Sequence, residues 1–200
     1  MQDLWRGTTA TKARIASGLI LFLYAFLHFL NIGLGLIDPV WMDQMQKWRQ
    51  LVTRSILGTI ILYGAFSVHI VFALSRLAGR RTLRMPVGEM AQIAMGLVIP
   101  VLLIAHIIHT RTAHEFYGVN DEMDYIMVLL HDTFDGWKQS LLLLIVWAHG
   151  CIGLHFWLRG KSWWREGLPA LAGLAVFVPA FALAGFLVEG RRGEYPKLCV

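Results

Sequence analysis

The sequence predicts an all-α, polytopic membrane protein with five transmembrane helices, four of which form a core four-helix bundle. First, 56% of the 200 residues are apolar and the mean hydropathy is +0.56, which exceeds the apolar content of an ordinary soluble domain. Second, five segments approach the roughly 20 apolar residues that a spanning helix needs: 15–37, 56–77, 87–108, 139–158 and 168–188. Third, each of the first four segments has a histidine in its interior, which sets these four apart from the fifth.

Polar or basic residues bound the first two segments. Segment 15–37 ends at Asp38 and Pro39, and segment 56–77 is followed by the basic run GRRTLR at 79–84. The chain before the first segment is polar and has no short apolar core with a small-residue cleavage site. We therefore expect 15–37 to be a retained helix and not a signal peptide.

Proline occurs inside two of the remaining segments. Pro100 lies in 87–108 and Pro179 in 168–188. A proline usually kinks a helix, but neighbouring helices can satisfy the freed backbone groups in a membrane. Segment 139–158 has no proline. The long loop before it contains the apolar stretch YIMVLL, which predicts a short interfacial or buried helix.

The distribution of Lys and Arg predicts the orientation. Loops on the side of the N-terminus hold ten Lys and Arg against three acidic residues, whereas the opposite loops hold five against eight. The positive-inside rule therefore places the N-terminus in the cytoplasm. The chain then divides into a cytoplasmic segment 1–14, a membrane domain 15–188 and a tail 189–200. The tail holds three cations on the outer side, which predicts a further span and a soluble domain in a longer chain.

Composition also argues against several function classes. The excess of Lys and Arg that gives the net charge of +5 is concentrated in the loops on one side of the membrane. The charge is therefore explained by membrane topology, and no nucleic-acid partner is expected. Cys151 and Cys199 form neither a CxxC nor a CxxCH pattern, which argues against covalent c-type haem and a thiolate metal site. Asp and Glu are absent from the interiors of the first four spans, which argues against a proton pump.

Four of the eight histidines lie well inside predicted spans: His28, His69, His106 and His149. A single buried histidine is often a neutral link between helices, but one on each of four consecutive spans favours a functional role. By depth, His28 pairs with His106 toward the outside, and His69 pairs with His149 toward the inside. Paired imidazoles on facing helices can hold haem. The pattern therefore predicts two haems b per chain.

Small and basic residues near these histidines fit the same interpretation. Gly64, Gly150 and Gly153 would let backbones approach a flat macrocycle, although glycine is also common at plain helix contacts. Haem propionates need cations at the membrane faces. Five arginines are candidates for this role, although each could instead simply anchor its helix at the membrane interface. The candidates are Arg14, Arg76 and Arg80 for the inner haem and Arg54 and Arg111 for the outer haem.

The remaining histidines have alternative roles. His109 lies three residues after His106, on the same helix face, and is a rival metal ligand. His155 lies six residues after His149, about 9 Å along the helix, which is too far to share one iron. It is a candidate to bind a propionate or a quinone carbonyl, or an interfacial residue. A quinone pocket at the outer face could use His114.

Four stretches resemble a known family: HFLNIGLGL at 28–36, HIVFALSRLAGRRTLRMP at 69–86, HIIHTRTAHEFYGV at 106–119 and HGCIGLHFWLR at 149–159. They resemble the cytochrome b-type membrane anchor that precedes the catalytic domain in certain bacterial class III adenylate cyclases. That anchor is itself similar to the di-haem subunit of succinate dehydrogenase and fumarate reductase. The resemblance extends over about 16–188.

The resemblance implies several properties. The four intramembrane histidines match the anchor's candidate haem ligands, and the location is the bacterial inner membrane. A fused or associated cyclase domain is implied, and with it a homodimer. The chain departs from the family pattern, because it shows five spans in place of six and no soluble region long enough for a cyclase. Ile32 stands where a second histidine is expected, which leaves His28 as the ligand candidate on its helix.

The leading hypothesis is a di-haem b anchor that exchanges electrons with quinone and acts as the redox-sensing domain of an adenylate cyclase. The chain alone would then be an electron-transfer or sensor module and not an enzyme. One alternative is a cytochrome b subunit of a respiratory, quinone-linked dehydrogenase or reductase. The other is a haem-free structural or transport protein of the lipid bilayer.

Overall fold

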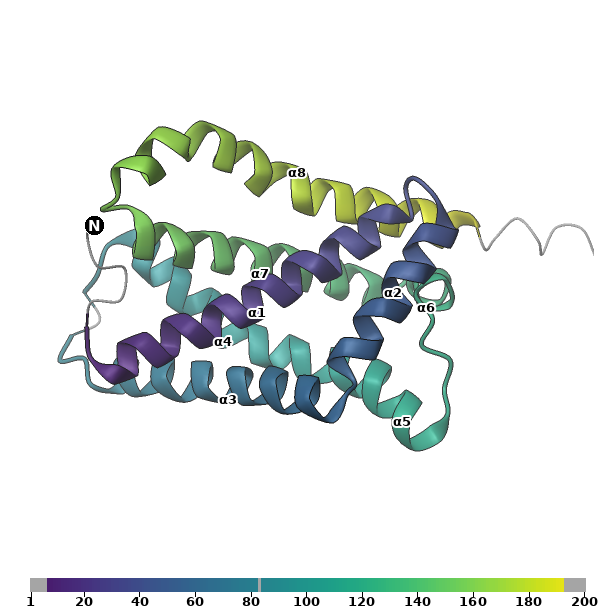
Figure 1. Ribbon diagram of the computed structural model, residues 1–200, viewed down its shortest axis with the longest axis horizontal. Coiled ribbons are helices and arrows are strands. Elements are labelled where there is room, and N and C mark those ends of the chain that lie inside the picture. The colour runs from purple at the N-terminus through teal and green to yellow at the C-terminus, as the bar shows by residue number, and fades with distance from the viewer. Residues whose placement is uncertain (1–6, 83, 193–200) are drawn as a thin grey trace, which may run out of the picture.

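The computed structural model describes residues 7–82 and 84–192, and these residues form an all-helical bundle (Figure 1). Five helices in this part of the chain are long and apolar enough to span a membrane, which confirms the predicted number and order. They are α1 (Thr9–Leu34), α3 (Ile56–Ala78), the run Val87–Tyr117, α7 (Phe134–Leu158) and α8 (Ser162–Arg192). The run comprises α4 (Val87–Ile107), a π-helical turn η1 (Ile108–Thr112) and α5 (Ala113–Tyr117). Cys199 and most of the tail lie outside the described residues.

Capping residues extend the helices beyond the apolar segments. Helix α1 begins at Thr9, six residues before the predicted start, because the Thr8 side chain accepts a hydrogen bond from the Thr11 N–H. Helix α7 likewise begins at Phe134, where the Thr133 hydroxyl accepts from the Gly136 N–H at 3.1 Å. Hydropathy marks the apolar centre of a helix, whereas its ends depend on such caps.

Two further helices cover one end of the bundle: α2 (Pro39–Thr53), which the apolar segments do not predict, and α6 (Met123–Leu130), which confirms the predicted short helix (Figure 1). We call this end the α2 end and the other the amino-terminal end. Gln46 joins the two helices, since its side chain donates to the Asp121 carbonyl at 2.9 Å and accepts from the Met123 N–H at 2.8 Å.

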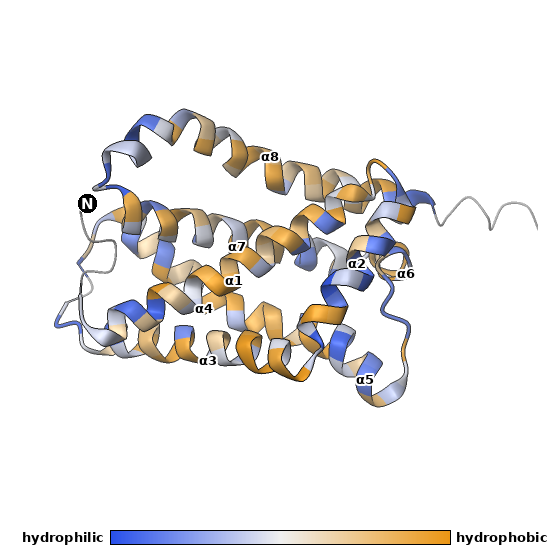
Figure 2. Cartoon of the chain, in the orientation of Figure 1, coloured by the Kyte–Doolittle hydropathy of each residue, from blue (hydrophilic) through white to orange (hydrophobic). Residues whose placement is uncertain are grey.

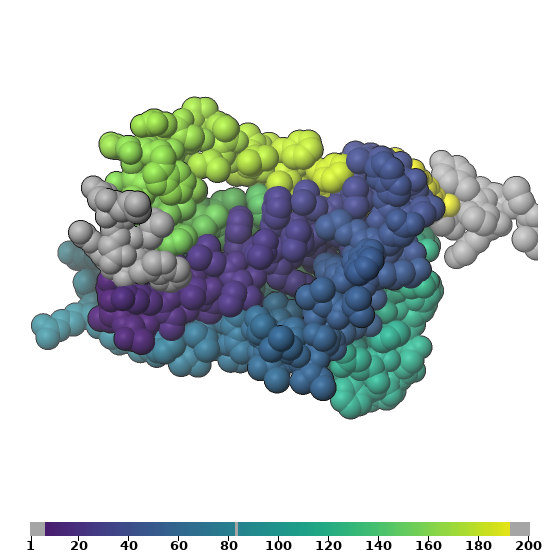
Figure 3. All heavy atoms as spheres, viewed as in Figure 1, coloured from purple at the N-terminus to yellow at the C-terminus, as the bar shows by residue number. Residues whose placement is uncertain are grey.

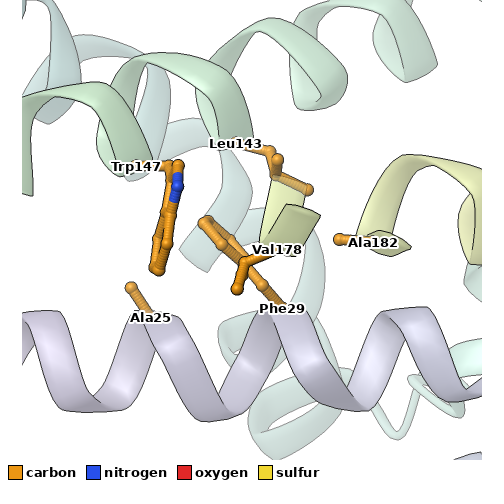
Figure 4. Close-up of a cluster of buried hydrophobic side chains, with 6 residues drawn as sticks. All are labelled: Ala25, Phe29, Leu143, Trp147, Val178 and Ala182. Atoms are coloured by element: carbon orange, nitrogen blue, oxygen red, sulfur yellow. The ribbon is translucent and has the colours of Figure 1, made fainter. Parts of the chain in front are cut away.

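The closely packed apolar core lies to one side of the bundle, between α1, α7 and α8 (Figure 4). Its buried members are Ala25, Phe29, Leu143, Trp147, Val178 and Ala182. The Trp147 indole donates to the Ala175 carbonyl at 2.8 Å, which fixes α8 against α7. The fifth span therefore packs outside the four histidine-bearing helices, as predicted. Between Trp164 and Ala175 it bows away from the rest of the bundle, whereas its second half packs closely (Figure 3).

The long helices are apolar over most of their length (Figure 2). Leu23, Ile56, Val101 and Val176 are all more than half exposed. Such continuous apolar surface is unfavourable in water and indicates contact with a lipid bilayer. The chain is therefore a multi-pass membrane protein by the length and composition of its helices.

Candidate functional site

Helices α1, α3, α4 and α7 enclose a cavity of about 1330 Å³ in the centre of the bundle. All four intramembrane histidines line this cavity: His28, His69, His106 and His149. Protein interiors are close-packed, and pockets for small ligands usually measure about 300–1,000 Å³. The cavity therefore has room for more than one small ligand.

The structure brings the four histidines together in two pairs. The ring centres of His28 and His106 are 6.2 Å apart, toward the α2 end. Those of His69 and His149 are 6.3 Å apart, toward the amino-terminal end. These are the two pairs that helix depth predicts, so their proximity is confirmed. Their role as metal ligands stays a prediction.

The two pairs lie in separate layers of the bundle. On α1, ten residues separate His28 from Gly18, which lies against a ring of the other pair. On α4, ten residues also separate His106 from Gly96, which lies against the second ring of that other pair. Ten residues of α-helix rise about 15 Å. The layers are therefore about that far apart along the bundle axis.

Backbone carbonyl groups hold the pair at the amino-terminal end. His69 Nδ1 lies 3.1 Å from the Arg14 carbonyl oxygen, and His149 Nδ1 lies 3.1 Å from the Gln92 carbonyl oxygen. A carbonyl can only accept, so each Nδ1 donates its proton and Nε2 carries the free lone pair. This is the tautomer in which an imidazole binds a metal through Nε2, with the bond at Nδ1 fixing the ring.

The pair at the α2 end has different surroundings. His28 Nδ1 is buried and has no hydrogen-bond partner among the described residues. Its ring stacks on Tyr24, with ring centres 5.9 Å apart. The His106 side chain forms a hydrogen bond with the Gln139 side chain. Buried polar nitrogens are nearly always satisfied, so the unpaired nitrogen of His28 fits a site that takes a ligand.

Two glycines that the sequence analysis does not single out make room for the imidazoles. A Cβ on Gly18 would lie 2.9 Å from His69 Cε1, and a Cβ on Gly96 would lie 3.0 Å from His149 Cε1. Both distances are shorter than ordinary carbon contacts. Any side chain at these positions would therefore displace a ring of the pair.

Of the three glycines that were predicted to lie close to a cofactor, two line the cavity and one does not. Gly150 and Gly153 line the cavity. A Cβ on Gly150 would overlap Phe22, and one on Gly153 would lie 3.1 Å from Gln92 Nε2. Gly64 does not line the cavity within the described chain, and a Cβ there would meet nothing within 4 Å.

Arginines line both ends of the cavity. At the amino-terminal end, Arg80 forms an ion pair with Glu89, whereas Arg14 and Arg76 form none with a carboxylate in residues 7–82 and 84–192. The structure thus places all three predicted cations at the mouth of the cavity. Two of them keep a charge that no acidic side chain there neutralises.

The predicted cations at the α2 end are already engaged. Arg54 forms an ion pair with Asp121. Arg111 forms one with Glu115 at 2.7 Å and also donates to the Thr59 hydroxyl at 2.8 Å. Both arginines therefore fasten the loop and α5 to the α2–α3 corner.

Arg49 is a cavity-lining cation that the sequence analysis does not include among its candidates. It donates to the Tyr24 hydroxyl at 3.2 Å and to Asn31 Oδ1 at 3.3 Å. The residue lies on α2, which carries no apolar segment. No sequence signal distinguishes it from an ordinary loop cation.

Three other candidate histidines do not line the cavity: His109, His155 and His114. His109 is exposed within η1 and does not line the cavity. The structure therefore favours His106 over its rival. His155 accepts a hydrogen bond from the Trp164 indole at 3.3 Å, near the turn between α7 and α8. His114 lies on α5 at the α2 end, where its Nδ1 is 2.9 Å from the Val119 carbonyl oxygen and 3.2 Å from Asp121 Oδ1.

No family model, no curated protein and no solved structure matches this chain. The described residues contain no group of three or more His, Cys, Asp and Glu side chains that could hold a bare metal ion. Each layer instead offers two facing imidazoles and room between four helices.

Proposed function

We propose that the protein is a membrane cytochrome b that holds two haems, one between His28 and His106 and one between His69 and His149. The separation of the paired rings carries this proposal. A metal binds an imidazole nitrogen at about 2.0–2.1 Å, as zinc does, and this nitrogen lies about 1.15 Å from the ring centre. Two imidazoles on opposite sides of one metal would therefore have centres about 6.4 Å apart. The observed 6.2 and 6.3 Å agree with this value.

The donor set also supports haem over a bare metal ion. Two imidazoles are too few for a closed zinc site, which takes four protein ligands. They are the usual protein contribution to a six-coordinate haem, whose porphyrin supplies the other four nitrogens. The size of the cavity and its apolar walls fit two flat macrocycles in two layers.

The chain's own residues orient and balance the bound groups. The carbonyls of Arg14 and Gln92 hold the imidazoles of His69 and His149 with Nε2 available to iron. Arg14 and Arg76 supply the positive charge that propionates require at the amino-terminal end. When bound, haem supplies one-electron transfer, and two haems about 15 Å apart along the bundle would form an electron path.

The resemblance noted in the sequence supports a more specific function. We propose that electrons are exchanged with quinone, that the N-terminus lies in the cytoplasm of a bacterial cell, and that the haem redox state regulates an adenylate cyclase domain. Such a cyclase would act as a homodimer. The alternative is a subunit of a respiratory dehydrogenase or reductase. Quinol-dependent turnover by a purified complex would favour that alternative, whereas redox-dependent cyclase activity would favour a sensor.

A haem count tests the proposal directly. We expect a reduced-minus-oxidised spectrum of b-type haem and two haems per chain by pyridine haemochrome. His69→Ala or His149→Ala should leave one haem, since each removes one ligand of a single pair. His155→Ala is the matched control on α7, because His155 does not line the cavity and bonds to the Trp164 indole, and it should keep both haems. A folded wild-type protein without haem, from haem-supplemented cells, would disprove the proposal.

A further inference from the structure

Arg49 reaches the cavity from outside the membrane-spanning helices. It lies on α2, which covers one end of the bundle, and its half-buried side chain lines the cavity. It donates to the hydroxyl of Tyr24, whose ring stacks on that of His28, so it lies beside the nearer pair, His28 and His106. A cation in this position influences any group held between those two rings.

Neutral side chains fix the orientation of Arg49. Its Nη1 donates to the Tyr24 hydroxyl, and its Nε donates to Asn31 Oδ1. Asn31 is fully buried and is itself anchored, because its amide donates to the Met42 carbonyl at 2.7 Å. The guanidinium also lies over the Tyr24 ring, 5.9 Å from its centre. These contacts position the group without cancelling its charge.

The other two cations at this end have carboxylate partners. Arg54 pairs with Asp121, and Arg111 pairs with Glu115. Arg49 forms no ion pair with an Asp or Glu of the described chain. A partly buried guanidinium without a counter-charge is costly, and it has five N–H donors, of which two are used. It therefore offers the remaining donors, including both on Nη2, to an anion.

We propose that Arg49, positioned by Tyr24 and Asn31, is an anion-binding subsite that takes a carboxylate side arm of the haem at the α2 end. The inference rests on the proposed function. Arg49 then replaces Arg54 and Arg111 as the main propionate partner, since carboxylates already neutralise the charges of those two arginines. Because a nearby positive charge favours the reduced form of the iron, Arg49 also raises the reduction potential of that haem.

The test uses a background with one haem. In His69→Ala only the haem at the α2 end remains, so its potential is measured without overlap. Adding Arg49→Gln should reduce the ratio of reduced to oxidised haem about tenfold at a fixed ambient potential, which is 59 mV for a one-electron couple. Arg49→Lys keeps the charge without the planar fork and should recover part of this shift. Lys47→Gln is the control, because Lys47 lies on the same helix, is exposed and pairs with Asp43.

The outcomes separate this inference from the proposed function. An unchanged potential and haem content in Arg49→Gln would overturn the subsite and leave the two-haem assignment intact. A change in the anionic lipid that copurifies, with no change in potential, would assign the subsite to a lipid phosphate and would also overturn it. Absence of haem from the wild type would disprove the proposed function itself. Retention of the second haem in the single variant Arg49→Gln would show that the protein still folds.

Discussion

Single glycines decide whether two imidazoles can face each other in this bundle. Gly96 lies so close to His149 that a Cβ would be 3.0 Å from Cε1. We expect Gly96→Ala to push the ring out of line and to weaken haem binding at the His69–His149 pair at least tenfold. The haem count should fall toward one per chain. The haem at the α2 end should keep its spectrum and potential.

Gly64→Ala is the matched control for this variant. A Cβ at Gly64 meets nothing within 4 Å, so both haems should remain. Alanine is also favoured over glycine within a helix by roughly 0.5–1 kcal/mol in water, so no loss of stability is expected. If Gly96→Ala and Gly64→Ala bind haem equally well, the close approach of Gly96 to His149 has no role in the site.

These residues show how far the sequence predicts the site. The four histidines stand out because ionisable side chains are rare inside apolar spans. Gly96 does not stand out, because glycine is frequent in membrane helices and its role depends on which ring lies opposite. Arg49 was missed for a similar reason, since the cavity reaches α2 only in three dimensions. Long-range contacts of this kind leave no local pattern in the chain.

Helix α2 is the element that the apolar segments do not predict. A signal for it exists, because Asp38 is a typical N-cap and Pro39 is favourable at the first helical position. Its residues are too polar for a spanning helix, so a search for apolar segments passes over it. The sequence also gives no sign of the π-helical turn after α4, in which His109 lies. The five spans, in contrast, follow from composition because lipid requires long apolar helices.

The attachment of α2 to the start of α6 depends on Gln46. Its buried side chain makes two hydrogen bonds, to the Asp121 carbonyl and the Met123 N–H. Gln46→Ala would leave both backbone groups without these partners, which costs about 1–3 kcal/mol for each buried group. We therefore expect a lower Tm and faster proteolysis of the loop between α5 and α6.

Gln44→Ala is the control, because Gln44 is exposed on the same helix. It should leave the Tm and the proteolysis pattern unchanged. Equal stability of the two variants would show that water replaces the Gln46 contacts and that α2 is held by other groups. Haem content at the α2 end provides an independent readout, because α2 carries Arg49 over that part of the cavity.

The bundle as a whole carries more uncompensated positive charge at its amino-terminal end. Arg14, Arg76 and Arg159 line the cavity there without a carboxylate partner in the described chain, whereas Arg49 is alone in this respect at the α2 end. A positive charge lowers the energy of an added electron. We therefore expect the haem at the amino-terminal end to have the higher reduction potential. The excess is two charges, but Arg76 and Arg159 are exposed to solvent, which screens them. If the screened excess amounts to about one charge at about 10 Å, with an effective dielectric constant of about 20, it is worth roughly 1–2 kcal/mol.

Redox titration of two single-haem variants measures this difference. His28→Ala should retain the haem at the amino-terminal end, and His69→Ala should retain the one at the α2 end. We expect the first to titrate at a potential higher by about 59 mV, which corresponds to a tenfold ratio. Arg76→Gln, added to His28→Ala, should remove much of the difference, because it deletes one of the three charges. Equal or reversed potentials would mean that ring geometry or solvent access outweighs charge. In the expected case, an electron that enters at the α2 end comes to rest at the opposite end, in the layer of His69 and His149.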